Sequence, residues 1–128
     1  MFGIFKKKVI DSPSIVLLNN FERLKTADNS TISALYMALN TQLQIFLISF
    51  PSMNDFINSS IDTRYQYGLK LMKMEEELEI KKMLVESVAC KLLRLFLATY
   101  IEQDNLGNKA EITKARNKFT NFLDTKSL

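Results

Sequence analysis

Apolar residues recur at steps of three and four along much of this chain, which is the spacing of one face of an α-helix. Leu17, Leu18, Phe21 and Leu24 predict a first helix over residues 15–24. The clearest apolar stripe lies near the end of the chain and consists of Ile112, Ala115, Phe119 and Phe122. Stripes of this kind are typical of helices that bury one face in a shared core.

Residues that begin or end helices occur between these stripes. Ser12 before Pro13 is a typical helix start, because a hydroxyl caps free N–H groups and proline is tolerated in the first turn. Asp28 can begin a second helix near position 31, and Pro51 should end it. A capping pair follows, since Ser52 precedes Asp55 by three residues.

A short helix can begin at this pair; later, Asp62 can cap a much longer helix, and Gly107 marks the stop before the last helix. Three glycines and two prolines are too few for the turns of a many-stranded sheet. We therefore expect an all-α protein, a compact bundle of four or five helices with one long helix at about 62–103. Residues 12–128 should form a single helical domain behind an N-terminal tail, residues 1–11.

No charged residue occurs from Asn29 to Asn54. This stretch is nominally long enough to cross a bilayer. However, Asn40, Gln42 and Gln44 lie near its middle, and unpaired amides are costly in hydrocarbon. We favour a central helix of the core, or one that faces another copy of the chain, so dimerisation is a hypothesis. The amides should then either point to solvent or form a buried network.

Charged residues crowd instead into positions 70–82, within the expected long helix. An apolar seam with heptad-like spacing passes through them, flanked by an oppositely charged pair four residues apart. Two lysines interrupt the seam at positions 81 and 82, where the helix could kink or break. The candidate surface for a partner protein is Tyr67, Leu71, Met74 and Leu78 with the charged Glu77 and Lys81.

The chain contains no histidine, which removes the side chain that most often performs acid–base catalysis and binds zinc. Its single cysteine, Cys90, lies among apolar residues and is expected in the core. No glycine-rich phosphate loop or paired-cysteine motif is present. We expect no enzyme activity, no cofactor and no metal. An enzyme would need a pocket built around Tyr36, Tyr65, Tyr67 or Tyr100.

The formal net charge is only +3, but basic residues gather near both ends of the chain. If the ends lie together, they form one basic patch that could attract phosphate groups or an anionic surface. The residues of this candidate patch are Lys6, Lys7, Lys8, Lys114, Arg116 and Lys118. The first three stand beside Phe2 and Phe5, a combination that could contact a membrane weakly.

Together these features favour a non-catalytic interaction protein, a small regulatory, adaptor or inhibitory module. It should bind another protein through a helical surface and associate with itself as a homodimer or larger homo-oligomer. A chain without cysteine pairs fits a reducing compartment, so we expect a cytoplasmic location. The alternative is a protein that binds nucleic acid or an anionic membrane surface through its terminal lysines.

Overall fold

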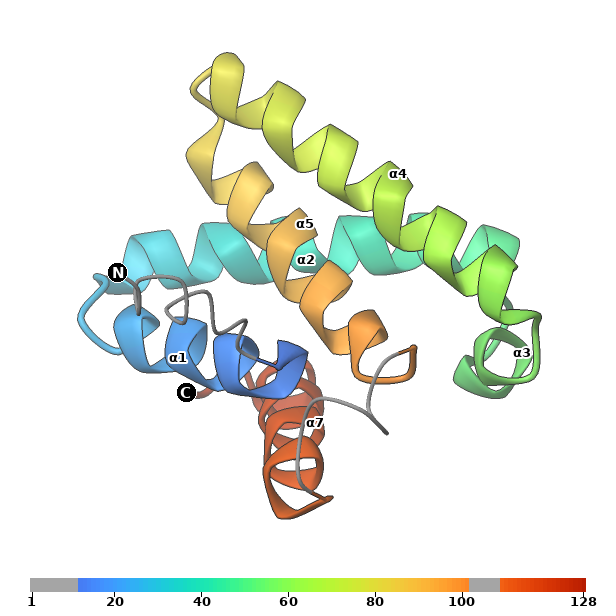
Figure 1. Cartoon of the computed structure of the whole chain (residues 1–128). Helices are drawn as coiled ribbons and strands as arrows, with labels where there is room; N and C mark the ends of the chain where they lie inside the picture. The colour runs from blue at the N-terminus through green and yellow to red at the C-terminus, as the bar shows by residue number, and fades with distance from the viewer. Residues whose placement is uncertain (1–11, 102–108) are drawn as a thin grey trace, which may run out of the picture.

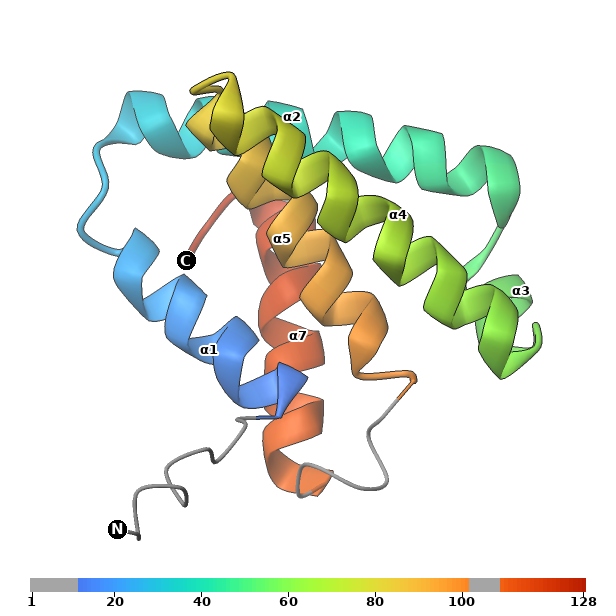
Figure 2. The same cartoon turned by 45° about the horizontal axis from the view of Figure 1, so that its top comes forward.

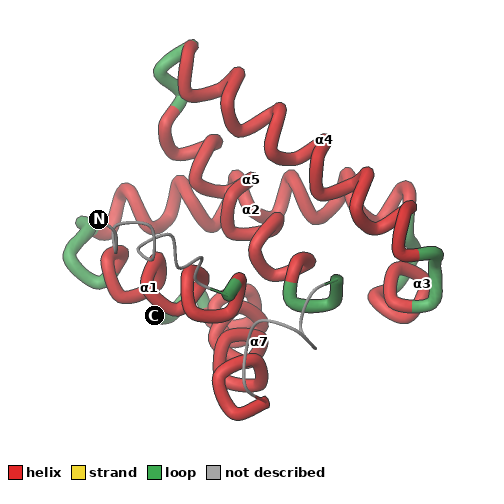
Figure 3. Tube along the Cα trace, viewed as in Figure 1, coloured by secondary structure: helices red, strands yellow, loops and turns green. Residues whose placement is uncertain are grey.

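The computed structural model describes residues 12–101 and 109–128, and within them every regular element is a helix (Figures 1 and 3). The helices are α1 (Pro13–Leu24), α2 (Asn29–Ser49), α3 (Met53–Ile57), α4 (Ile61–Ile80), α5 (Leu84–Ala98) and α7 (Lys109–Thr125). They pack into a compact bundle, which confirms the all-α prediction. The described part of the chain thus holds six helices, one more than the upper expectation.

The ends of the first three helices follow from local capping. Ser12 Oγ accepts a hydrogen bond from the backbone N–H of Ile15, and Asp28 caps α2 in the same way. Ser52 caps α3, and its hydroxyl also donates to the Asp55 carboxylate at 3.0 Å. At α4 the cap is Ser60 rather than the expected Asp62, which lies in the first turn instead. Each cap satisfies a free N–H group within the sequence that surrounds it.

The expected long helix at 62–103 is two helices, α4 and α5, joined by a tight reversal. Lys82 has a φ of 62°, in the left-handed region, and its N–H bonds the carbonyl of Glu79. The N–H of Met83 bonds the carbonyl of Leu78 at 2.9 Å. This pair of bonds is a Schellman motif, which ends a helix by satisfying its last carbonyls. The chain therefore breaks at the lysines and α5 folds back against α4 (Figure 1).

Helix α5 is the centre of the bundle and packs against α1, α2, α4 and α7 (Figure 2). Leu92, Leu93 and Leu97 on this helix are fully buried. At one side of α5, Phe96 stacks on Phe119 of α7 with ring centroids 4.1 Å apart. The second half of the expected 62–103 helix is thus a core helix of its own.

A second aromatic cluster lies where α2, α3 and α4 meet. Phe46 contacts Phe50, Phe56 and Tyr67 with ring centroids 5.3–5.5 Å apart. Phe56 is fully buried, so the short α3 acts as a cover for this end of the core. Aromatic pairs at these distances add to the stability that burial alone supplies.

Helix α2 is only partly buried, which corrects the expectation of a central buried helix. Its buried residues are Leu35, Leu39 and Phe46, which face α5 and the aromatic clusters. No other helix of the described part of the chain lies over the opposite side of α2, and Met37 and Ile48 on that side are 69% and 82% exposed. The uncharged segment therefore has one face in the core and one face at the surface.

Candidate interaction surface

The outer side of α2 carries a regular stripe of exposed, uncharged residues. We call this set the outer stripe; it consists of Ala34, Met37, Thr41, Gln44 and Ile48. The steps between successive members are three, four, three and four, the spacing of the a and d positions in a coiled coil. All five are exposed, and no charged residue lies anywhere on α2.

Two polar side chains of α2 form hydrogen bonds within the helix itself. Thr41 donates its hydroxyl to the carbonyl of Met37 at 3.1 Å, and Asn40 donates its amide to Tyr36 at 2.9 Å. Gln44 is exposed, whereas Gln42 turns inward and its Oε1 atom is buried without a hydrogen-bond partner. The amides therefore form no buried network of the kind considered from the sequence.

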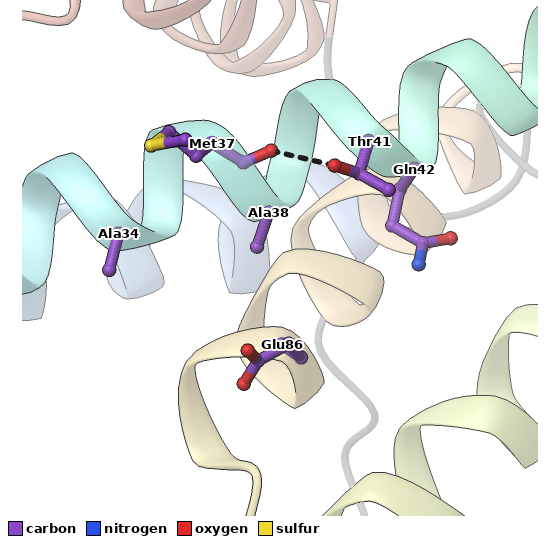
Figure 4. Close-up of a pocket in the computed structure, with 6 residues that line it drawn as sticks. All are labelled: Ala34, Met37, Ala38, Thr41, Gln42 and Glu86. Carbon is purple, nitrogen blue, oxygen red and sulfur yellow. Dashed lines mark hydrogen bonds between the residues drawn. The ribbon is translucent and has the colours of Figure 1, made fainter.

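A hollow of about 440 Å³ opens beside the outer stripe, between α2 and the start of α5 (Figure 4). Ala34 and Ala38 form its floor because their methyl groups leave space that larger side chains would fill. Met37, Thr41 and Gln42 complete the α2 side, and Glu86 of α5 lies opposite them. Glu86 is the one ionisable residue in this lining, so the hollow offers contact area rather than a catalytic arrangement.

Helix α2 is also long and apolar enough, by length and composition, to cross a membrane. In the fold, 17% of that candidate span is buried inside the protein. The same property that makes α2 a candidate span, a long uncharged surface, also makes it a candidate contact for another protein. The two possibilities differ in what must happen to Thr41 and Gln44, which would have to enter hydrocarbon in the first case.

The predicted seam on α4 divides between core and surface. Tyr67 and Leu71 are 7% and 1% exposed and pack against neighbouring helices, so they do not reach the surface. Met74 and Leu78 are partly buried, whereas Glu77 and Lys81 are exposed. The structure thus separates these six residues rather than forming one surface, and a partner role for the exposed members stays a prediction.

Other exposed apolar side chains lie on α4 and at its turn into α5. Ile80 is 80% exposed and Leu84 is 61% exposed, on either side of the reversal at Lys82. Five further exposed apolar residues follow the outside of α3 and α4: Ile57, Ile61, Tyr65, Leu69 and Met72. Exposed charged residues stand beside them in the sequence, namely Asp62, Lys70 and Lys73 along α4 and Glu79 and Lys81 around Ile80, which distinguishes this surface from the uncharged outer stripe.

The candidate basic patch is only partly within the described residues, because Lys6, Lys7 and Lys8 lie outside them. Arg116 donates to the hydroxyl and carbonyl of Thr99 and lies 3.7 Å from the ring centroid of Tyr100. Lys118 donates to the carbonyl of Leu128 at 2.7 Å.

Lys114 is exposed, and with Lys118 it lies near enough to Glu22 of α1 to influence that carboxyl. The pKa of Glu22 is lowered chiefly by its hydrogen bond to Lys25, and the two lysines of α7 add to the effect. Two of the three described basic residues therefore contact protein groups, and all of them lie near an acidic or carbonyl partner.

A polar cluster joins α4 to α5. Glu75 is 8% exposed, and Arg94 donates two hydrogen bonds to its Oε1 atom at 3.0 and 3.2 Å. The hydroxyl of Ser87 donates to the backbone carbonyl of Glu75 at 3.1 Å. The pair of α4 and α5 is thereby held in one register. Nothing in the sequence pattern separated Glu75 from its acidic neighbours; its inward direction depends on the reversal at Lys82.

Cys90 lies next to this cluster and is fully buried. Burial raises the pKa of its thiol to about 11, and the nearby Glu75 carboxylate acts in the same direction. Because the thiolate is the reactive form, the thiol is poorly suited to nucleophilic chemistry near neutral pH. The position agrees with the expectation of a core residue.

The tyrosines that an enzyme pocket would need are in separate places. Tyr36 donates its hydroxyl to the carbonyl of Leu123, Tyr67 is in the aromatic cluster, and Tyr100 lies under Arg116. Tyr65 is half exposed on α4. Within residues 12–101 and 109–128, no three potential metal-binding side chains gather at one place.

From the sequence we considered the uncharged segment at 29–54 as a contact with another copy of the chain, but we did not identify the outer stripe within it. Its signal was present, since the three–four spacing can be counted along residues 34–48. The same helix has a second apolar face, with Leu35, Leu39 and Phe46. The sequence alone does not say which of the two faces is buried, so the exposed one could not be identified from it. The chain matches no family model, no curated protein and no solved structure.

Proposed function

We propose that this protein is a non-catalytic interaction module that binds another protein chain through the outer stripe of α2. The observation that supports the proposal is a long helix that carries no charge and yet leaves one whole face at the surface. Large apolar side chains exposed on an uncharged face, here Met37 and Ile48, are typical of a surface that contacts another protein. A regulatory or adaptor role in the cytoplasm would suit a small helical protein with one unoxidised cysteine.

A protein partner suits this face better than a membrane or a nucleic acid. Helices that lie on membranes usually carry lysines or arginines that attract anionic lipids, and α2 has none. Nucleic acid binding needs cations directed at phosphates, whereas Arg116 and Lys118 contact protein groups. A protein partner can supply hydrogen bonds to Thr41 and Gln44 and apolar contact to Met37 and Ile48.

Photo-crosslinking in the native host tests this proposal. A photo-reactive amino acid is placed at position 37 in the outer stripe or, as a control, at exposed position 120 on α7. We expect defined crosslinked protein products from position 37 and none from position 120. Equal crosslinking from both positions, or crosslinking from neither, would contradict a specific protein contact at α2.

A further inference from the structure

We propose that the outer stripe binds a second copy of this chain, with the two α2 helices antiparallel and related by a twofold axis. This inference rests on the proposed function and names the partner of the same face. A twofold axis beside Gln42 and Leu43 places Met37 of each copy against Ile48 of the other. The same axis places Thr41 against Gln44. In coiled-coil terms, each a position meets a d position of the other copy, the layer arrangement of antiparallel pairs.

The outer stripe contains both a protruding side chain and a place to receive it. Ile48 is 82% exposed and stands at one end of the stripe. The hollow at the other end is lined on α2 by Ala34, Met37, Ala38, Thr41 and Gln42, with Glu86 of α5 at its far side. The first four of these residues have the spacing i, i+3, i+4 and i+7, which is the spacing of a four-residue hole that accepts one side chain of a facing helix.

The positions of the knob and the hole agree with one axis. Along the axis of α2, the centre of the hole lies between Met37 and Ala38. A twofold axis that places Ile48 of the other copy at this point must cross α2 between positions 42 and 43. The same operation inserts Ile48 of the first copy into the hole of the second. A twofold interface requires this reciprocity, since the same patch on both copies must fit itself.

The middle of the proposed interface is polar and can pair with itself. Thr41 donates its hydroxyl within its own helix, to Met37, and its oxygen keeps acceptor capacity. The side-chain amide of Gln44 is exposed and forms no hydrogen bond within the described residues. Across the axis, each Gln44 amide can donate to the Thr41 hydroxyl oxygen of the other copy. Such a central polar layer favours one register over others.

The absence of charge is the reason for choosing a second copy over another partner. In a twofold interface a charge close to the axis lies near its own copy, which costs free energy, and α2 brings no charge there; Glu86 of α5 is the one ionisable residue that lines the hollow. The chain as a whole has a net charge of +3, but α2 contributes none of it. A parallel pair would align the two hollows with each other and leave both unfilled, so the antiparallel pair is favoured.

The size of the face sets the expected affinity. A helix of this length presents a strip about 31 Å long and about 10 Å wide. That strip is small beside the roughly 800 Å² per partner of typical stable interfaces. We therefore expect a reversible dimer at micromolar concentrations.

Sedimentation equilibrium of the full chain tests the interface with a matched pair of variants. Ile48 and Ile80 are 82% and 80% exposed, and each lies within the last two residues of its helix. Lysine is tolerated at such positions because cations suit a helix C-terminus. We expect Ile48→Lys to weaken dimerisation about tenfold or more, because it removes the side chain that fills the hollow of the other copy at both ends of the interface. Ile80→Lys should dimerise like the unmodified chain.

A second substitution removes the hollow without adding charge. Ala34→Leu keeps a strong helix former at an exposed position and fills the space that Ile48 of the other copy would occupy. We expect it to weaken dimerisation as well. Circular dichroism of all three variants should match the unmodified chain. A dimer that survives both α2 substitutions, or a chain that stays monomeric at several hundred micromolar, would overturn the inference.

Disulfide trapping tests the antiparallel arrangement. Chains carrying Thr41→Cys and chains carrying Gln44→Cys are mixed and oxidised mildly. The antiparallel pair predicts that the mixed disulfide forms fastest, whereas a parallel pair predicts 41–41 and 44–44 disulfides and would contradict it. The natural Cys90 is buried and does not compete.

The inference and the proposed function can fail separately. If the pure chain is monomeric while position 37 still crosslinks to a different protein in the host, the proposed function stands and the second copy is excluded. If dimerisation fails and position 37 gives no specific product, both are excluded.

Discussion

Lys82 occupies a backbone conformation that suits glycine. Its φ of 62° places it at the end of α4, where the Schellman bonds to Leu78 and Glu79 form. A side chain in this region costs about 1–2 kcal/mol. We expect Lys82→Gly to raise the free energy of unfolding by up to about 1 kcal/mol, after the greater flexibility of glycine in the unfolded chain is subtracted. Urea unfolding of both chains measures the difference.

Gly68 provides the opposite change as a control. It lies inside α4 with a negative φ, and a Cβ atom added there meets nothing within 4 Å. Gly68→Ala should raise the free energy of unfolding by about 0.5–1 kcal/mol. If Lys82→Gly instead lowers stability, the reversal is held by contacts of the lysine side chain rather than by backbone geometry.

We expect the buried thiol of Cys90 to lower the free energy of unfolding at alkaline pH. The thiol has a pKa of about 11 in the folded chain against 9.0 for an unperturbed group. Below pH 9 both states keep the proton; between pH 9 and about 11 only the unfolded state loses it, so the free energy of unfolding falls as pH rises. Tyr67, whose pKa burial also raises, acts in the same direction.

Thermal unfolding between pH 8 and 11 measures this fall, and Cys90→Ala should make it shallower. The native thiol should also react very slowly with a thiol reagent at about pH 8 and rapidly in denaturant. Fast reaction of the native protein would show that the thiol is accessible.

At the scale of elements, the Glu75–Arg94 pair joins α4 to α5. We expect removal of either partner to lower the free energy of unfolding strongly. The two side chains are only 10% and 23% exposed. Arg94→Met leaves a buried carboxylate without its partner, which should cost about 3 kcal/mol. Changing both residues to apolar ones of similar size should recover most of that loss. Denaturant unfolding of the single and double variants measures it.

The surface pair of Lys25 and Glu22 is the control for this prediction. Its side chains are 48% and 67% exposed, so Lys25→Met should leave stability nearly unchanged. A similar effect from Arg94→Met and Lys25→Met would mean that burial does not strengthen the inner pair.

At the scale of the whole molecule, the uneven placement of charge predicts how association responds to salt. Because α2 carries no charge, dimerisation should change little between about 50 and about 200 mM salt. Binding through the terminal lysines to phosphates would weaken about 10³-fold over that range if six contacts formed. Sedimentation at both salt concentrations separates the two modes, and a steep loss would favour the basic patch.

Much of the secondary structure follows from residues close together in the sequence. Ser12, Asp28 and Ser52 cap helices within three residues of themselves. The stripe of α7 is buried as its spacing predicts, at Ile112, Ala115, Phe119 and Phe122. These features depend on hydrogen bonds and periodicity within one or two turns, so the sequence alone determined them.

The tertiary structure alone decided which apolar faces are buried. Tyr67 and Leu71 enter the core because the chain reverses at Lys82 and α5 packs against α4. The sequence does not mark this reversal, since a lysine occupies the position where glycine is usual. The outer stripe stays at the surface because α5 covers one side of α2 and, within residues 12–101 and 109–128, no helix packs on the other side. A helix with two apolar faces buries the one that its neighbours reach, and sequence periodicity does not specify those neighbours.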